Sequence, residues 1–237
     1  MNWETISSLA TAGGTLVLAV ATFASVRSAN RAARTSEAAA RIAERSLMAG
    51  LRPVLVTSRL QDARQKTQFQ EGNYLTVDGG RAAFELTADV VYMAMSLRNV
   101  GTGLGVLHGW HMCAGGQFER VHPPLEDFTD QVRDIFLAPD DTGAWSGAFR
   151  DPAAPAFQLA AAAIKDGRQL TMHLLYGDFE GGQRMITQFN IRRAGESWLT
   201  SAARHYNVDR PEPRAAPPGQ NYPASPAPDD QDQDASG

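Results

Sequence analysis

The chain has 237 residues, of which 43% are apolar and 20% charged, a composition typical of a globular protein. Its net charge of -4 argues against general nucleic-acid binding, which requires a clustered basic surface. The single cysteine, Cys113, excludes an intramolecular disulfide and any site built from several cysteines. One domain with additional segments fits this length.

The first segment, residues 1–26, predicts a transmembrane anchor. From Thr5 to Val26 no residue is charged, and a helix of 22 residues spans about 33 Å, enough to cross a bilayer core. Trp3 sits where an interfacial aromatic residue is expected, and Arg27 ends the run. Three alternatives are weaker. A signal peptide would begin with basic residues, a buried helix is seldom apolar all round, and an interfacial helix would show a polar face.

The flanking charges predict the orientation of this anchor. Arg27, Arg31 and Arg34 follow the span, whereas no Lys or Arg precedes it, and positive flanks stay in the cytoplasm. We therefore expect an inner-membrane protein with its N-terminus outside and its C-terminal domain in the cytoplasm. Ser7, Gly14 and Ala21 recur every seven residues, a stripe that would allow a homodimer through this helix, although small residues are common throughout the chain.

Residues 27–52 form an Arg/Ala-rich stem with a net charge of +4, from six arginines and two glutamates. Strong helix formers fill it, and Glu37 and Arg41 have the favourable i,i+4 order. We expect the anchor helix to continue through the stem and to end near Gly50 and Pro53. The arginines either fix topology alone or also contact anionic lipid head groups.

Residues 53–210 predict a mainly β domain, an antiparallel sandwich or a barrel-like fold, because short β-prone runs alternate with glycine-rich turns. Glycine pairs predict two hairpins, one at Gly79-Gly80 and one at residues 177–182. The expected strands are 53–58, 73–78, 82–87, 90–99, 104–114, 169–176, 183–192 and 198–206.

Two short helical insertions interrupt these strands. Leu125, Phe128, Val132 and Ile135 recur at helical spacing, as do Phe157, Ala160 and Ile164 before Gly167. The last segment, 211–237, contains seven prolines and a net charge of -4, which predicts a disordered tail.

Three residues of the domain could suggest a metal site: His108, His111 and Cys113. On a strand, His108 and His111 point to opposite faces, and His111 with Cys113 supplies only two ligands. We therefore interpret these side chains as packing residues. The sequence contains no cofactor motif, so we expect no catalytic, cofactor-binding or metal-binding residues and no cofactor.

Other polar motifs also have structural explanations. A glycine-rich loop follows one predicted strand, with Gly101, Gly103 and Gly105. A phosphate-binding loop would lead into a helix, whereas a strand is expected here, so a tight turn or bulge with positive φ explains these glycines better. Asp178 and Glu180 flank Phe179 in the second hairpin loop. Paired acids can serve general acid–base chemistry, but turns favour Asp and Gly for backbone reasons alone.

One acidic group would lie on the expected helix 125–136. Glu126, Asp130 and Asp134 would stack at i,i+4 there, as a solvated face or a docking surface for a basic partner.

The layout resembles a loose group of uncharacterised bacterial single-pass membrane proteins with a small cytoplasmic β-sandwich. The similarity rests on the charge-free span, the Arg/Ala helix, Arg52-Pro53, Asn99-x-Gly101-x-Gly103 and Tyr176-x-Asp178-x-x-Gly181. It implies placement and fold, and carries no site residues or activity.

Two functions are compatible with this organisation. The first is a membrane-tethered module that binds another protein at the cytoplasmic face and is not an enzyme. The second is a tethered enzyme or small-ligand receptor that uses the loops Gly101–Gly105 and Asp178–Gly182, together with Trp145. Neither the biochemical role nor the partner follows from the sequence.

Overall fold

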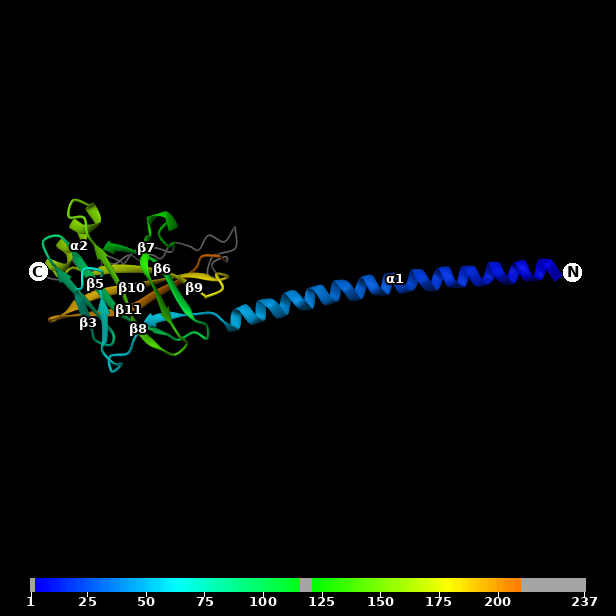
Figure 1. Ribbon diagram of the computed structural model, residues 1–237, viewed down its shortest axis with the longest axis horizontal. Coiled ribbons are helices and arrows are strands. Elements are labelled where there is room, and N and C mark those ends of the chain that lie inside the picture. Colours follow the sequence, from blue (N-terminus) through cyan, green and yellow to red (C-terminus); the bar gives the residue numbers. More distant parts are fainter. Residues whose placement is uncertain (1–2, 116–120, 210–237) are drawn as a thin grey trace, which may run out of the picture.

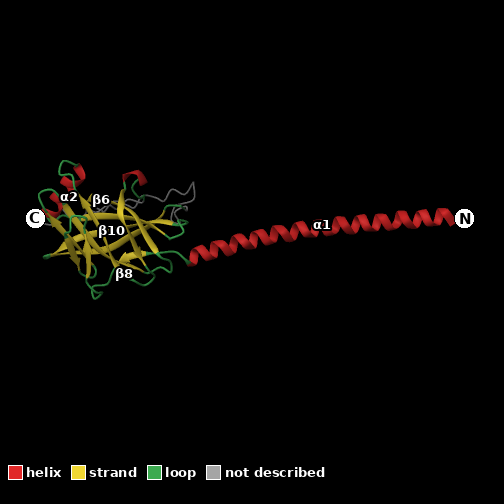
Figure 2. Ribbon diagram, in the orientation of Figure 1, coloured by secondary structure: helices red, strands yellow, loops and turns green. Residues whose placement is uncertain are grey.

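The computed structural model describes residues 3–115 and 121–209. Within the N-terminal helix, the side chains of residues 3–12, 45, 48 and 49 lie outside that description, as does the predicted tail 211–237. The described residues form one long helix followed by one body of β strands (Figure 1). Figure 2 shows the strands gathered at the C-terminal end of this helix.

The long helix, α1 (Trp3–Gly50), contains 48 residues and extends away from the strands (Figure 1). At 1.5 Å per residue it is about 72 Å long. The Thr22 hydroxyl donates to a backbone carbonyl one turn earlier, at 2.8 Å, so this polar side chain is satisfied within the helix. The prediction that anchor and stem form one helix that ends near Gly50 is confirmed.

The outer surface of α1 carries both apolar and charged side chains. Leu16, Val20 and Phe23 are largely exposed, and Glu37 pairs with Arg41 at 3.7 Å as predicted. Across the described residues, no helix combines the length and the hydropathy that a membrane crossing requires. The predicted span Thr5–Val26 begins among residues whose side chains are not described, and it stays a prediction.

The β body contains eleven strands in the described residues, and every pairing is antiparallel. They are β1 (Leu55–Thr57), β2 (Gln65–Gln68), β3 (Tyr74–Val77), β4 (Arg81–Leu86), β5 (Val91–Asn99), β6 (Gly105–Ala114), β7 (Thr129–Leu137), β8 (Thr142–Phe149), β9 (Leu170–Gly177), β10 (Arg184–Ala194) and β11 (Ser197–Asn207).

Nine of these strands form one curled sheet, and β2 and β3 form a small second sheet. The large sheet has the order β1-β5-β4-β11-β10-β9-β6-β7. β1 and β4 pair with successive parts of one edge of β5, and β8 pairs with its other edge. The curl makes a half-barrel that brings β8 and β7 toward each other. The predicted mainly β, antiparallel class is confirmed, and of the two expected architectures the barrel-like one is closer.

The main hydrophobic core fills one face of this curled sheet. It includes the fully buried Trp145, Tyr176 and Phe189, together with side chains from most of the strands. The helix α2 (Pro155–Lys165) packs on this core through Phe157, Ala160 and Ala163. The two alanines let the helix approach the sheet closely, because a larger side chain would hold it off.

Strand β5 is buried on both faces. Val91, Met93, Met95 and Leu97 point into the main core, as the alternation predicted. The opposite face packs Tyr92 and Ala94 against the small β2–β3 sheet, where Phe69, Leu75 and Val77 complete a second core. The small sheet therefore covers the outer face of β5, which explains why this strand is the most continuously apolar one in the chain.

The helix predicted for residues 125–136 is wrong. A single 3-10 turn covers Leu125–Asp127, and the remainder is strand β7, paired with β6. The apolar positions do not share a buried face: Phe128 packs on His111, whereas Val132 is 70% exposed. The helical spacing of these positions is a coincidence, because β7 is held as a strand by its pairing with β6. The second predicted helical insertion is confirmed as α2, followed by Gly167 with φ +66°.

The hairpin predicted at Gly79-Gly80 is also wrong, although a turn lies there. β3 pairs with β2, and β4 pairs with β5 and β11, so the turn connects two sheets. A Cβ at Gly79 would overlap the backbone carbonyl of Arg59, and Gly80 has φ +69°. Both glycines are required by this close crossing of two backbone segments. The hairpin at 177–182 is confirmed by the β9–β10 ladder.

Candidate binding cleft

The half-barrel has an open seam where its two end strands face each other. In the described residues β7 pairs only with β6 and β8 only with β5, so no ladder joins them. The Gln131 side chain bridges the seam: its Nε2 donates to the Ser146 carbonyl at 3.1 Å. Its Oε1 accepts a hydrogen bond from Trp145 Nε1 at 3.2 Å. One side-chain amide thus occupies part of the space that another strand would fill.

A cleft of about 280 Å³ opens in this seam. It is lined by Gln68, Phe69, Gln70, Trp110, Thr129–Arg133, Ser146–Ala148 and Arg150. Its buried wall is aromatic, because the Trp110 ring packs edge-on against Trp145 and Phe149 at centroid distances of 5.5 and 5.0 Å. At Gly147 a Cβ would lie 2.6 Å from the Trp145 ring, so glycine leaves room for these rings.

The rim of the cleft is charged. Arg150 Nε lies 2.5 Å from Glu71 Oε1, and this hydrogen bond lowers the pKa of the Glu71 carboxyl below its ordinary value. Asp130 and Arg133 project from β7 on the other side. An aromatic wall with charged groups of both signs at its edge suits a peptide segment that carries one apolar side chain and a polar backbone.

The lining combines aromatic, amide, hydroxyl and charged side chains. The described residues that line the cleft include no histidine, cysteine, lysine or tyrosine. Ser146 is one of the hydroxyl residues of the cleft, and its Oγ accepts a hydrogen bond from the Thr67 hydroxyl at 3.1 Å. The cleft has the volume and the polar groups to hold a ligand.

Sequence reasoning did not identify this cleft. β8 was missed because its residues, Thr142–Phe149, are mostly Gly, Ala and Ser. Trp145, expected in a loop near a ligand site, is instead a core residue of this strand and is 1% exposed. The acidic residues Asp130 and Asp134 lie exposed on β7 and Glu126 in the preceding 3-10 turn, so their expected helical stack is absent.

The loop Gly101–Gly105 packs against the start of the domain. A Cβ at Gly101 would overlap the Arg52 carbonyl, and one at Gly103 the Leu51 carbonyl. Val100 N donates to Val54 O at 2.8 Å and Thr102 N to Arg52 O at 3.1 Å. The expected positive φ is wrong for these glycines; close backbone contact is the reason for them.

Asn99 holds the same junction from inside. Its Oδ1 accepts hydrogen bonds from Val54 N at 3.1 Å and Gly101 N at 2.9 Å. Its Nδ2 donates to Gly103 O at 2.7 Å and Leu137 O at 3.0 Å. This fully buried amide therefore ties together the segment that follows α1, the glycine loop and the end of β7.

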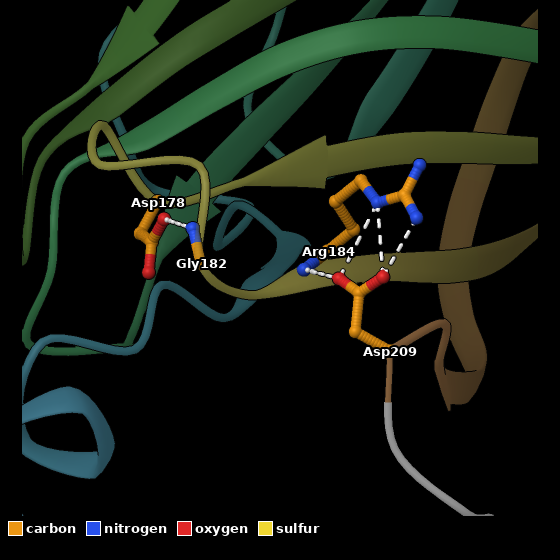
Figure 3. A network of polar contacts seen from close by, with 4 residues as sticks. All are labelled: Asp178, Gly182, Arg184 and Asp209. Atoms are coloured by element: carbon orange, nitrogen blue, oxygen red, sulfur yellow. Dashed lines mark hydrogen bonds and ion pairs between the residues drawn. The ribbon is translucent and has the colours of Figure 1, made fainter. Parts of the chain in front are cut away.

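The second loop, Asp178–Gly182, is organised by Asp178. Its Oδ1 accepts a hydrogen bond from Gly182 N at 2.7 Å, across the hairpin loop (Figure 3). Its Oδ2 accepts one from Gln183 Nε2 at 3.4 Å. Asp178 is buried and shapes the turn, whereas Glu180 is exposed. Nearby, Arg184 and Asp209 form an ion pair at 2.7 Å that joins β10 to the end of the described chain (Figure 3).

The structure separates the two histidines that the sequence placed close together. β6 and β9 change register between Leu107 and Gly109, so His108 lies in a β-bulge, next to Gly177. His111 and Cys113 share a face as expected, and His173 of β9 lies directly opposite His111. Ligand atoms of His111, Cys113 and His173 all lie within 4.8 Å of one another.

Burial controls the protonation of this cluster. It lowers the pKa of His173 to about 4, with the neighbouring His111 and His122 acting in the same direction. Burial also lowers the pKa of His111, against the charge of Asp127. Both imidazoles are therefore neutral at pH 7 and retain a lone pair. Only His108, His111 and Cys113 were considered as possible ligands from the sequence, and His173 was not included.

Comparison of the chain with protein family models, curated proteins and solved structures found no match.

Proposed function

We propose that this protein is a membrane-tethered binding module that captures an extended segment of a partner protein in the cleft between β7 and β8. The observation that carries the proposal is the seam itself, where two strand edges without a ladder to each other face an aromatic-walled cleft. An exposed strand edge offers backbone donors and acceptors that another chain can pair with.

The dimensions of the cleft favour a peptide over a small molecule. Its volume of about 280 Å³ lies at the lower limit of small-molecule sites, which have roughly 300–1,000 Å³. One large side chain fits this volume, and the neighbouring residues of an extended peptide would run along β7. Val132 and Phe136 are exposed on that strand and would add apolar contact.

The helix α1 supplies the tether in this proposal. The charge-free run Thr5–Val26 would cross the inner membrane with the N-terminus outside, and the arginines from Arg27 onward would remain at the cytoplasmic face. The β body would then lie in the cytoplasm, where the tether raises its local concentration near membrane partners. The resemblance in layout to the loose group of bacterial single-pass proteins supports this placement. A homodimer through the helix is compatible with it.

The alternative, a tethered enzyme or receptor built on the two predicted loops, has less support. Gly101–Gly105 contacts the backbone that follows α1, and Asp178 shapes its own hairpin. Asn99 and Asp178, the buried polar side chains that shape these loops, are engaged in structural hydrogen bonds. The cleft is therefore the better candidate site.

In-cell photocrosslinking tests the binding proposal. A photoreactive amino acid at position 132, beside the cleft, should trap a partner that co-purifies from solubilised membranes. Thr129→Trp, which places an indole in the cleft, should abolish this crosslink. Thr76→Trp is the matched control, because Thr76 is also an exposed strand threonine but lies on β3 outside the cleft. An identical crosslink in both variants would refute capture in the cleft.

Two further measurements test the tether. A chain that lacks residues 1–52 should lose membrane association and the partner crosslink. A C-terminal alkaline phosphatase fusion should be inactive, because the domain stays in the cytoplasm. An active fusion would overturn the proposed orientation.

A further inference from the structure

A cluster of three potential ligands lies on the face of the sheet away from the main core. His111 and Cys113 project from β6, and His173 projects from the neighbouring strand β9. His111 and His173 are directly opposed in the ladder, and Cys113 is two residues further along β6, on the same face. The cluster is separate from the cleft, whose lining contains none of these residues.

One nitrogen of each imidazole is buried without the hydrogen bond that burial normally demands. His173 is 1% exposed, and its Nδ1 has no hydrogen-bond partner among the described residues. Nδ1 of His111 is a second buried ring nitrogen with no such partner. A buried polar atom left unpaired is destabilising, and most are satisfied in folded proteins. Two in one cluster require an explanation.

The surroundings hold the His173 ring in a fixed orientation. Gln188, opposite His173 on β10, hydrogen-bonds the ring, and Tyr206 donates to Gln188 Oε1 at 3.0 Å. Metal-binding histidines are commonly held this way, with one ring nitrogen bonded to a second residue and the other free for the ion. The chain Tyr206–Gln188–His173 has this form.

We propose that His111, Cys113 and His173 bind one divalent metal ion of the zinc class, with a fourth coordination position open to water. A thiolate with two imidazoles is a ligand set that zinc prefers. Ligand atoms around tetrahedral zinc are about 3.5 Å apart, given bonds of about 2.0–2.3 Å. The ligand atoms of the three side chains lie within 4.8 Å of one another, and side-chain rotations would bring them closer around a bound ion.

The β-bulge at His108 is what creates this geometry. If β6 kept its regular alternation through His108 instead of forming the bulge, the residues that follow would exchange faces. His111 and Cys113 would then point into the core in place of Trp110 and Met112. The Phe128 ring lies 5.8 Å from the His111 ring and covers the cluster on one side, which limits access of solvent.

Titration of the full-length protein, purified in detergent and stripped with a chelator, tests the proposal. Zn²⁺ should bind at one ion per chain and raise the melting temperature. Co²⁺ should give a thiolate-to-metal absorption band, and Zn²⁺ should protect Cys113 from alkylation.

Four variants identify the ligands. Cys113→Ser should remove the Co²⁺ thiolate band, and His111→Ala should weaken Zn²⁺ binding by more than the roughly 10- to 100-fold that loss of an outer-shell partner costs. Gln188→Leu should weaken it within that range. His108→Ala is the matched control, since this exposed histidine lies on the same strand outside the cluster, and should leave binding unchanged. His111 and Cys113 are only half-buried, so these variants should fold.

Three results would overturn the proposal. They are no binding of Zn²⁺ by the wild type, binding that Cys113→Ser and His111→Ala retain at full strength, and binding that His108→Ala loses. The partner crosslink from position 132 is an independent readout, so failure here leaves the cleft proposal standing.

Discussion

Replacing Gln131 by leucine tests whether the seam of the half-barrel is held by a single side chain. Gln131 donates to the Ser146 carbonyl and accepts from the Trp145 indole, and leucine has a similar volume without either group. Each lost hydrogen bond is worth about 1 kcal/mol, and a buried indole NH without a partner adds to the loss. Trp145 is 1% exposed, so water has little access to it. We expect the free energy of unfolding to fall by about 2–3 kcal/mol.

Thermal unfolding followed by tryptophan fluorescence measures this effect. For a domain of this size, about 2–4 °C of melting temperature corresponds to 1 kcal/mol, so Gln131→Leu should lower the midpoint by about 5–10 °C. Gln68→Leu is the matched control, because Gln68 lines the same cleft but is exposed. It should change stability by less than about 0.5 kcal/mol. Equal midpoints for the two variants would show that Gln131 does not hold the seam.

Two other predictions follow from the polar contacts of the domain. Asn99→Ala should destabilise the protein by about 3–5 kcal/mol in urea unfolding, because it removes four hydrogen bonds of about 1 kcal/mol each, two of them buried. A loss below about 1 kcal/mol would contradict the junction described above. A hydrogen bond from Arg184 lowers the pKa of the Asp209 carboxyl in the folded protein. The ion pair therefore stabilises the fold at pH values above the unfolded pKa of about 3.9. This contribution is lost as the pH falls through the lower pKa of the folded state. The pair is partly exposed, so Asp209→Asn should cost less than about 1 kcal/mol at pH 7, and its stability should converge with that of the wild type in acid; a constant difference down to pH 2 would exclude the linkage.

Local patterns predicted the elements whose burial follows directly from sequence. The alternation in β5 placed Met93 and Met95 on the core face, and a glycine-rich loop marked the β9–β10 hairpin. α2 was evident from Phe157 and Ile164 at helical spacing before Gly167. In these segments the side-chain period and the turn residues are set within about ten residues, so no distant partner is needed to interpret them.

Elements that depend on distant contacts were missed or misassigned. The helical spacing of Leu125 and Phe128 hid strand β7, because its pairing with β6 is not visible locally. Predicting the cluster of His111, Cys113 and His173 would have required two long-range features of the fold. The bulge at His108 reverses the parity of β6, and the β6–β9 register brings His173 opposite His111. No local pattern contains either one.

The way α1 leads into the β body makes the orientation of the domain depend on the length of the stem. Hydrogen bonds from Asn99 and from the loop Gly101–Gly105 hold the chain just after Gly50. A rotation of α1 about its own axis would therefore turn the β body and its cleft with it. One alanine added among Ala38–Ala40 would turn the cleft by about 100° and advance it by about 1.5 Å. Seven added alanines would make nearly two full turns, so the cleft would face almost its original direction and lie about 10 Å further along the helix axis. Stem length therefore sets both how far the domain lies from the start of the helix and which way its cleft faces around the helix axis.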